Sequence, residues 1–164
     1  MAGVIEARLR DAGIELPPAP APAANYVPFV VTGNQVFVSG QVPFVGSERH
    51  FIGRVGEEYG VEEAQQAART VALNIIAQVK VACGGDLDRV VRCVKLGGFV
   101  NCTPDFLQHP QVINGASDLM VEVFGDKGRH ARYAVGFPRR GRAGLSRRTR
   151  RAPVGRWRGH GVSR

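Results

Sequence analysis

The sequence lacks any apolar run that approaches the roughly 20 residues needed to span a membrane. Its N-terminal segment also lacks the apolar core of a secretory signal, because Glu6, Arg8, Arg10 and Asp11 interrupt it. From these two absences we expect a cytoplasmic protein with no membrane partner.

Paired cysteines and the spacing of a zinc site are missing too. The three cysteines are Cys83, Cys93 and Cys102. An odd number without a Cys-x-x-Cys pair does not indicate a disulfide framework. Three of the four histidines, at 50, 109 and 130, are scattered, which disfavours a structural zinc site. We therefore predict buried, unreactive thiols.

Acidic residues are absent from Gly136 onward, where the chain has ten arginines. Twelve basic and fourteen acidic residues remain in the preceding part, so the formal charge of +8 comes from the C-terminal segment. This segment has no apolar run long enough for a strand and too little apolar surface to offset its ordering entropy. We predict a folded domain over 1–136 and a basic tail over 137–164, either disordered or translated out of frame from a GC-rich gene.

Hydrophobic periodicity in the first part predicts an α+β fold. Helices are expected over 4–12, 61–83 and 106–124, a β-hairpin over 26–31 and 35–39, and strands over 50–55, 90–100 and 129–135. A proline-rich linker is expected over 16–24. Thr103 and Pro104 are the expected cap and first residue of the third helix. This order predicts one mixed sheet with two helices packed on one face, and the uncovered sheet face favours a homo-oligomer.

Several short motifs occur in a characteristic order. They are Val-Ser-Gly-Gln-Val-Pro at 38–43, Leu-Asn at 73–74, the strand at 91–100, Val-Ile-Asn at 112–114, and His-Ala-Arg-Tyr-Ala-Val-Gly at 130–136. Over residues 3–136 this set resembles the Rid family, the reactive intermediate deaminases also written RidA/YjgF. Leu-Gly-Gly-Phe-Val at 96–100 and Asn-Gly-Ala-Ser-Asp at 114–118 are similar to a branch distinct from the archetype.

The resemblance implies a chorismate-mutase-like fold, a homotrimer with pockets between subunits, and no metal or organic cofactor. The implied reaction is hydrolysis of enamines and imines, such as 2-aminoacrylate, to 2-keto acids and ammonia. Arg132 matches the arginine that holds the substrate carboxylate, and a planar guanidinium suits that role. The backbone at Ala134 matches the group that binds the substrate nitrogen or water. Tyr26, Ser39 and Asn114 match other pocket-lining positions.

The sequence departs from the family after Gly136, where the tail replaces a final strand and a glutamate that handles water or protons. This departure predicts a less stable fold or altered assembly, and impaired deamination. Two other functions stay open: an RNA-binding or ribonuclease-like protein that acts through the basic tail, and a non-catalytic small-molecule binder. Taken singly, Arg132 also fits a surface ion pair, Ser39 a turn, and Asn114 a helix surface.

Overall fold

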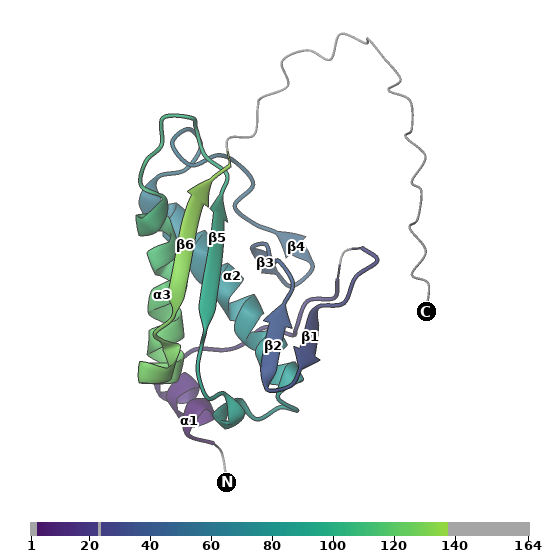
Figure 1. Cartoon of the computed structure of the whole chain (residues 1–164). Helices are drawn as coiled ribbons and strands as arrows, with labels where there is room; N and C mark the ends of the chain where they lie inside the picture. The colour runs from purple at the N-terminus through teal and green to yellow at the C-terminus, as the bar shows by residue number, and fades with distance from the viewer. Residues whose placement is uncertain (1–2, 23, 138–164) are drawn as a thin grey trace, which may run out of the picture.

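The computed structural model describes residues 3–22 and 24–137 (Figure 1). The predicted tail therefore lies outside the described residues, apart from Phe137. The helices are α1 (Val4–Asp11), α2 (Val61–Ala82) and α3 (His109–Phe124), with 3₁₀ turns η1 (Leu87–Arg89) and η2 (Gly125–Gly128). The strands are β1 (Phe29–Thr32), β2 (Gln35–Val38), β3 (Phe44–Val45), β4 (Glu48–Arg49), β5 (Lys95–Val100) and β6 (Ala131–Gly136).

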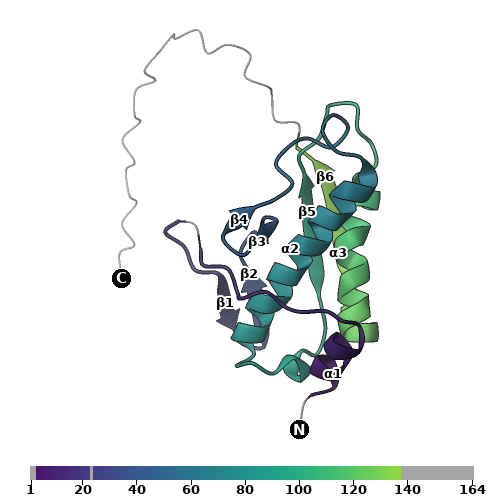
Figure 2. The same ribbon diagram turned by 180° about the vertical axis from the view of Figure 1, so that it is seen from behind.

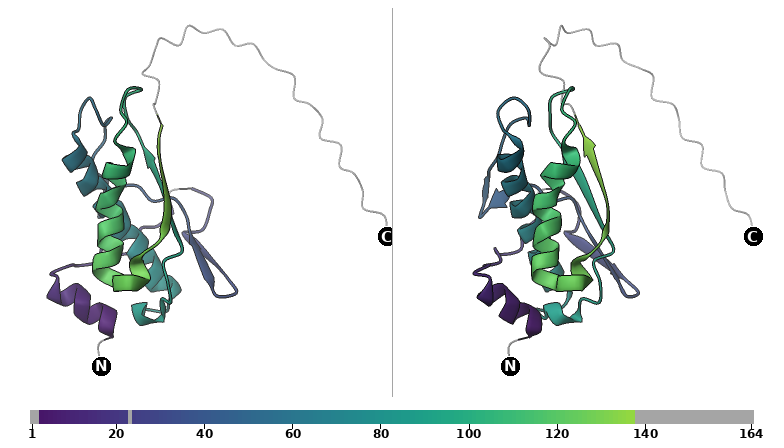
Figure 3. Two further views of the ribbon diagram at one scale, coloured as in Figure 1. Left: turned by 60° about the vertical axis from the view of Figure 1, so that its left-hand side comes forward. Right: turned by 90° about the vertical axis from the view of Figure 1, so that its left-hand side faces the viewer.

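The molecule has two layers, and the long helices lie behind the strands in Figure 1, in front of them in Figure 2 and beside them in Figure 3. The β1–β2 hairpin packs on α2, whereas β5 and β6 pack on α3. The predicted arrangement of two helices on one face of the strands is confirmed. None of the helices in the described ranges is long and apolar enough to cross a lipid bilayer.

The predicted single mixed sheet is wrong for the described residues, which form three two-stranded sheets. The β1–β2 and β3–β4 pairs are antiparallel, and the β5–β6 pair is parallel. The hairpin and β5 lie on the same side of the helices, but no described strand hydrogen-bonds to both (Figure 1).

The predicted strand over 50–55 is also absent. The strand pairing occurs earlier, in β3 and β4, and only Val55 of the predicted range makes isolated bridges, to Tyr59 and Cys102. Phe51 has a φ of 54°, in the left-handed region. That conformation breaks an extended backbone, so a strand cannot continue through it.

Helix α2 agrees with the predicted range to within one residue. Its first turn is fixed by the Glu63 carboxylate, which accepts a hydrogen bond from the Gly60 backbone N–H at 2.8 Å. Gly84, with a φ of 69°, follows its C-terminal end. The helix packs on α3 around fully buried side chains that include Ile76 and Leu119. This helix pair forms most of the core, and it supports the strands that carry the predicted site.

Helix α3 starts three residues later than predicted, and Thr103 and Pro104 do not begin it. The Thr103 carbonyl instead accepts the N–H of Phe106 at 3.2 Å, which closes a turn. A helix beginning at 106 would place Pro110 in its interior, where a proline removes a backbone hydrogen bond. With His109 as its first residue, Pro110 falls in the first turn, where no such bond is lost.

Strand β5 begins at Lys95, five residues after the predicted start. Residues 87–89 form η1, and the Cys93 N–H donates to the Lys127 carbonyl at 2.8 Å, outside any strand pairing. The β-branched residues at 90, 91 and 94 therefore belong to a connection, and their strand propensity is overridden by tertiary contacts.

The N-terminal end of α1 is capped by a side chain that is distant in sequence. The Asp88 carboxylate accepts hydrogen bonds from the backbone N–H groups of Val4 at 2.7 Å and Ile5 at 2.8 Å. These two bonds lower the pKa of Asp88 below its ordinary value. A carboxylate at this end also interacts favourably with the helix dipole.

Replacing Asp88 with asparagine is expected to lower the melting temperature at pH 7. The pKa of Asp88 is lower in the folded chain than in the unfolded chain. Its carboxylate therefore stabilises the fold above the unfolded pKa, and this contribution is lost as the pH falls through the folded pKa. The difference between wild type and variant should shrink below about pH 4, as thermal melts across this range would reveal. Asp118→Asn, on the exposed side of α3, is the matched control, and equal melting temperatures at pH 7 contradict the prediction.

Candidate functional site

Arg132 lies on β6 with its guanidinium held from one side. Its Nη1 donates a hydrogen bond to the Ser117 hydroxyl of α3 at 3.0 Å. The side chain is exposed, and it makes no ion pair with any carboxylate in the described part of the chain. A guanidinium has five N–H donors, so most of its hydrogen-bonding capacity is left for an anion. This geometry fits the predicted carboxylate-binding role.

Ser117 also contacts a histidine, which precedes Arg132 by two residues. The Ser117 Oγ lies 3.1 Å from His130 Nε2, and His130 Nδ1 lies 2.6 Å from the Gly128 carbonyl oxygen. A carbonyl oxygen only accepts hydrogen bonds, so Nδ1 carries a proton. In the neutral imidazole Nε2 is then the acceptor, and the Ser117 hydroxyl donates to it.

The backbone at Ala134 faces away from β5. The Ala131 N–H donates to Val94 and the Phe137 N–H donates to Val100, at 3.1 and 2.7 Å. Backbone groups alternate in direction along a strand, so those of Arg132 and Ala134 point to the outer edge of β6. The Ala134 side chain packs on the core next to α3. The outer edge therefore offers polar backbone groups next to the Arg132 guanidinium.

Asn114 lies one turn before Ser117 on α3 and is half-buried. Residues three apart on a helix share one face, and Ser117 on that face contacts β6. Three of the predicted site residues, Arg132, Ala134 and Asn114, therefore belong to the β6–α3 side of the molecule. We call this the β6 half of the site.

Tyr26 and Ser39 belong to a different region, next to the β1–β2 hairpin. The Ser39 hydroxyl donates to the Val27 carbonyl at 2.6 Å, and this bond ties β2 to the segment that carries Tyr26. The Tyr26 side chain is exposed. Because β5 lies between this hairpin and β6, the structure does not bring Tyr26 and Ser39 together with Arg132 within one chain (Figure 1). We call them the hairpin half.

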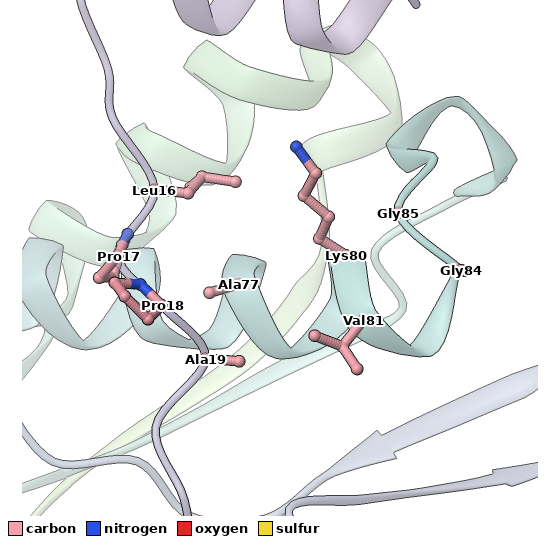
Figure 4. Close-up of a pocket in the computed structure, with 9 residues that line it drawn as sticks. All are labelled: Leu16, Pro17, Pro18, Ala19, Ala77, Lys80, Val81, Gly84 and Gly85. Atoms are coloured by element: carbon pink, nitrogen blue, oxygen red, sulfur yellow. The ribbon is translucent and has the colours of Figure 1, made fainter.

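A hollow on the surface of the described part of the chain is unrelated to these residues. It is an open groove of about 630 Å³ where the proline-rich segment crosses the C-terminal end of α2 (Figure 4). It is lined by Leu16, Pro17, Pro18, Ala19, Ala77, Lys80, Val81, Gly84 and Gly85. Its one charged group, Lys80, is paired with Glu6 at 3.7 Å. The groove thus has no free charge and shares no residue with either half.

The cysteine thiols are poor candidates for nucleophiles. All three are free, as the sequence predicts, but only Cys102 is buried, and Cys83 and Cys93 are half-buried. Burial raises the pKa of Cys93 to about 11, and it also raises the pKa of Cys83 and Cys102. A thiol with a raised pKa carries little of the reactive thiolate at neutral pH.

One group of carboxylates in the described ranges is close enough to hold a cation. The oxygens of Glu6, Asp86 and Asp88 lie within 4.8 Å of one another. These groups already have protein partners, since Asp88 caps α1 and Glu6 pairs with Lys80. We assign them to the docking of α1.

Sequence reasoning missed Ser117 and His130 as partners of Arg132. The spacing of residues in the sequence contained a signal for both. His130 and Arg132 are two apart at a strand, which places them on one face. Asn114 and Ser117 are three apart on a helix, which also places them on one face. The sequence could not show that this face of the strand packs against this face of the helix.

The comparisons with known proteins agree with this fold. A family model described as "YjgF/chorismate_mutase-like, putative endoribonuclease" matches residues 6–143. Protein TCP17 from Trypanosoma cruzi is 50% identical over 135 residues, which cover 82% of this chain and 84% of that protein. The crystal structure of Atu1372 from Agrobacterium tumefaciens, a protein of unknown function, matches with a TM-score of 0.75 and 48% identity, covering 82% of each chain. A structure described as a "putative endoribonuclease" from Shewanella oneidensis MR-1 matches with a TM-score of 0.79 and 40% identity, covering 83% of this chain and 89% of the other.

Proposed function

This chain belongs to the YjgF/chorismate mutase-like family, and from that premise we propose that it hydrolyses reactive enamines and imines of small amino acids. The substrate class is 2-aminoacrylate and its imine, and the products are a 2-keto acid and ammonia. The observation that carries the proposal is the exposed Arg132 guanidinium, which is bonded to Ser117 and to no carboxylate in residues 3–22 and 24–137. We propose no cofactor and a cytoplasmic location.

Each residue of the β6 half has a role in this reaction. Arg132 binds the substrate carboxylate through two parallel hydrogen bonds. The outward backbone groups of Ala134 bind the substrate nitrogen or the attacking water, and the Asn114 amide orients the substrate from α3. The experiment that tests the function is release of ammonia and pyruvate from enzymatically generated 2-aminoacrylate, compared with the rate in the absence of the protein.

We propose that the complete site forms between copies of the chain in a homotrimer. The β6 half and the hairpin half lie on opposite sides of β5, so a neighbouring copy is needed to join Arg132 to Tyr26 and Ser39 (Figure 1). The strand face opposite the helices supports this assembly. Phe99 is 71% exposed there, and its ring packs edge-on against Tyr133 with centroids 5.7 Å apart. Tyr133 and Val135 of β6 are 41% and 42% exposed, and a contiguous apolar patch, unlike a single exposed side chain, marks an interaction site.

Replacing Phe99 with aspartate is therefore expected to dissociate the trimer and to reduce turnover with it. A charge on this face would lose its water on assembly without gaining a partner. Size-exclusion chromatography with light scattering measures the mass directly. Val91→Asp, also exposed but outside the strands, is the control. A Phe99→Asp protein with the wild-type mass and activity would contradict the proposed interface.

An endoribonuclease is the second candidate, and the family description favours it. The charge of the folded part argues against it, because residues 1–135 have twelve basic and fourteen acidic side chains. RNA binding depends on neutralising several phosphates, which needs a basic surface. Binding through the arginines of the predicted tail, like a non-catalytic role for the same pocket, stays an alternative to the deaminase.

A further inference from the structure

We infer that Ser117 and His130 form a proton-transfer pair for the ligand that Arg132 holds. The inference rests on the proposed function and adds two residues to it. Neither residue was among those matched to the family's pocket. Both are half-buried, and they are joined in one hydrogen-bonded chain that ends at the exposed guanidinium.

The hydrogen bonds fix the direction of proton transfer. The Gly128 carbonyl holds the proton on His130 Nδ1, so Nε2 is the basic nitrogen. Nε2 points at the Ser117 hydroxyl, 3.1 Å away. The same hydroxyl oxygen accepts from Arg132 at 3.0 Å, which leaves one of its lone pairs free. A base oriented by a third group and bonded to a hydroxyl is the arrangement that activates hydroxyl groups in enzymes.

Ser117 and His130 also supply a proton-accepting group next to Arg132, where no carboxylate of the described residues is bonded. The last acidic residue of the chain is Asp126, and it is bonded to Arg129 at 3.2 Å. No carboxylate in the described ranges is bonded to Arg132, Ser117 or His130. Hydrolysis of an imine requires a group that accepts a proton from water and returns it to nitrogen. A histidine side chain held within hydrogen-bond reach of a hydroxyl can act as both acceptor and donor of such a proton.

We propose that hydrolysis starts from the protonated imine. Water attacks the carbon of the protonated imine, the C=N π pair moves to nitrogen, and the water proton passes to Ser117 Oγ while the Ser117 proton passes to His130 Nε2. The neutral carbinolamine then takes that proton back on its nitrogen through Ser117. The C–N bond then breaks, and its electron pair leaves on ammonia. A lone pair of the hydroxyl oxygen forms the C=O bond. The hydroxyl proton passes through Ser117 to His130 and then to solvent. The products are the 2-keto acid and ammonia, which takes up a proton from solvent to become ammonium.

Kinetics of single variants test the pair. His130→Ala and Ser117→Ala are each expected to lower kcat for 2-aminoacrylate about 100-fold. The KM of His130→Ala should stay within about twofold, because Arg132 is unchanged. Imidazole added to His130→Ala should restore part of kcat, which a structural role of the ring would not allow. His50→Gln, an exposed histidine outside the site, is the matched control. Wild-type kcat in either alanine variant, or no rescue by imidazole, would overturn the inference.

A binding experiment separates this inference from the proposed reaction. Pyruvate added to the ¹⁵N-labelled protein is expected to shift the His130 Nε2 resonance, and the shift should disappear in Arg132→Ala. If this shift occurs in a protein that turns over no imine, the pair is supported and the proposed reaction is wrong. If the wild type turns over imines and pyruvate leaves the His130 resonances unchanged, the reaction stands and the pair is overturned.

Discussion

An Arg132→Ala protein should hydrolyse 2-aminoacrylate with a kcat/KM about 10- to 100-fold below that of the wild type. The expected decrease in kcat/KM follows from the loss of hydrogen bonding to a charged group, and such a hydrogen bond contributes roughly 1.5 to 3 kcal/mol. The measurement is ammonia and pyruvate release from enzymatically generated 2-aminoacrylate. If the guanidinium binds the carboxylate in the ground state as well as the transition state, most of the loss should appear as a higher KM.

Two further variants isolate the guanidinium itself. Arg132→Lys keeps the charge and loses the planar fork, so it should recover only part of the activity. Arg129→Ala removes an exposed arginine three residues earlier, one that pairs with Asp126 at 3.2 Å, and should leave turnover near the wild-type value. Equal losses in Arg129→Ala and Arg132→Ala would indicate a general effect of charge, and an unaffected Arg132→Ala would refute the proposed site.

The sequence predicted the helices well because their signals are local. In α2 the apolar residues recur at helical spacing, Glu63 lies in the first turn, and Gly84 follows the end. Helix α3 was predicted three residues too early because Thr103 and Pro104 have the composition of a helix start. Thr103 and Pro104 instead belong to the turn that the Phe106 N–H closes on the Thr103 carbonyl. The helix begins at His109, which places Pro110 in its first turn.

The strands were harder because their pairing is not local. The hairpin was predictable from Gly33 and Asn34, and Gly33 does adopt a φ of 57° between the paired Thr32 and Gln35. The prediction of a single sheet was wrong, because no strand in residues 3–22 and 24–137 pairs with both β5 and the hairpin. The alternation of apolar and polar residues shows which side chains of a strand share a face. It does not show which other strand pairs with that strand.

The sequence predicted which residues belong to the candidate site, but it did not predict how they are arranged in space. The family motifs led to Arg132, Ala134 and Asn114, and the structure places these on one side of the molecule. The bond from Arg132 to Ser117 depends on how β6 docks on α3, a contact between residues fifteen apart. The packing of α3 on α2 also depends on a contact between distant residues, and one glycine of α3 makes it.

Gly115 is that residue, and Gly115→Ala is expected to lower the free energy of unfolding by about 1 to 3 kcal/mol. A methyl group at 115 would overlap the backbone carbonyl of Gln65 in α2 and would lie 2.9 Å from the Gln65 Cα. Backbone atoms cannot rotate away as a side chain can, so the helices must separate. The gain in helix propensity from glycine to alanine is about 1 kcal/mol and opposes this loss, but overpacking between the two main helices should outweigh it.

Urea unfolding at a fixed protein concentration measures the difference. Gly40→Ala is the matched control, because nothing lies within 4 Å of the added methyl group and its backbone is not left-handed. Its free energy of unfolding should stay within about 0.5 kcal/mol of wild type. A Gly115→Ala protein more stable than the wild type would mean that helix propensity dominates and that α2 and α3 can separate at little cost.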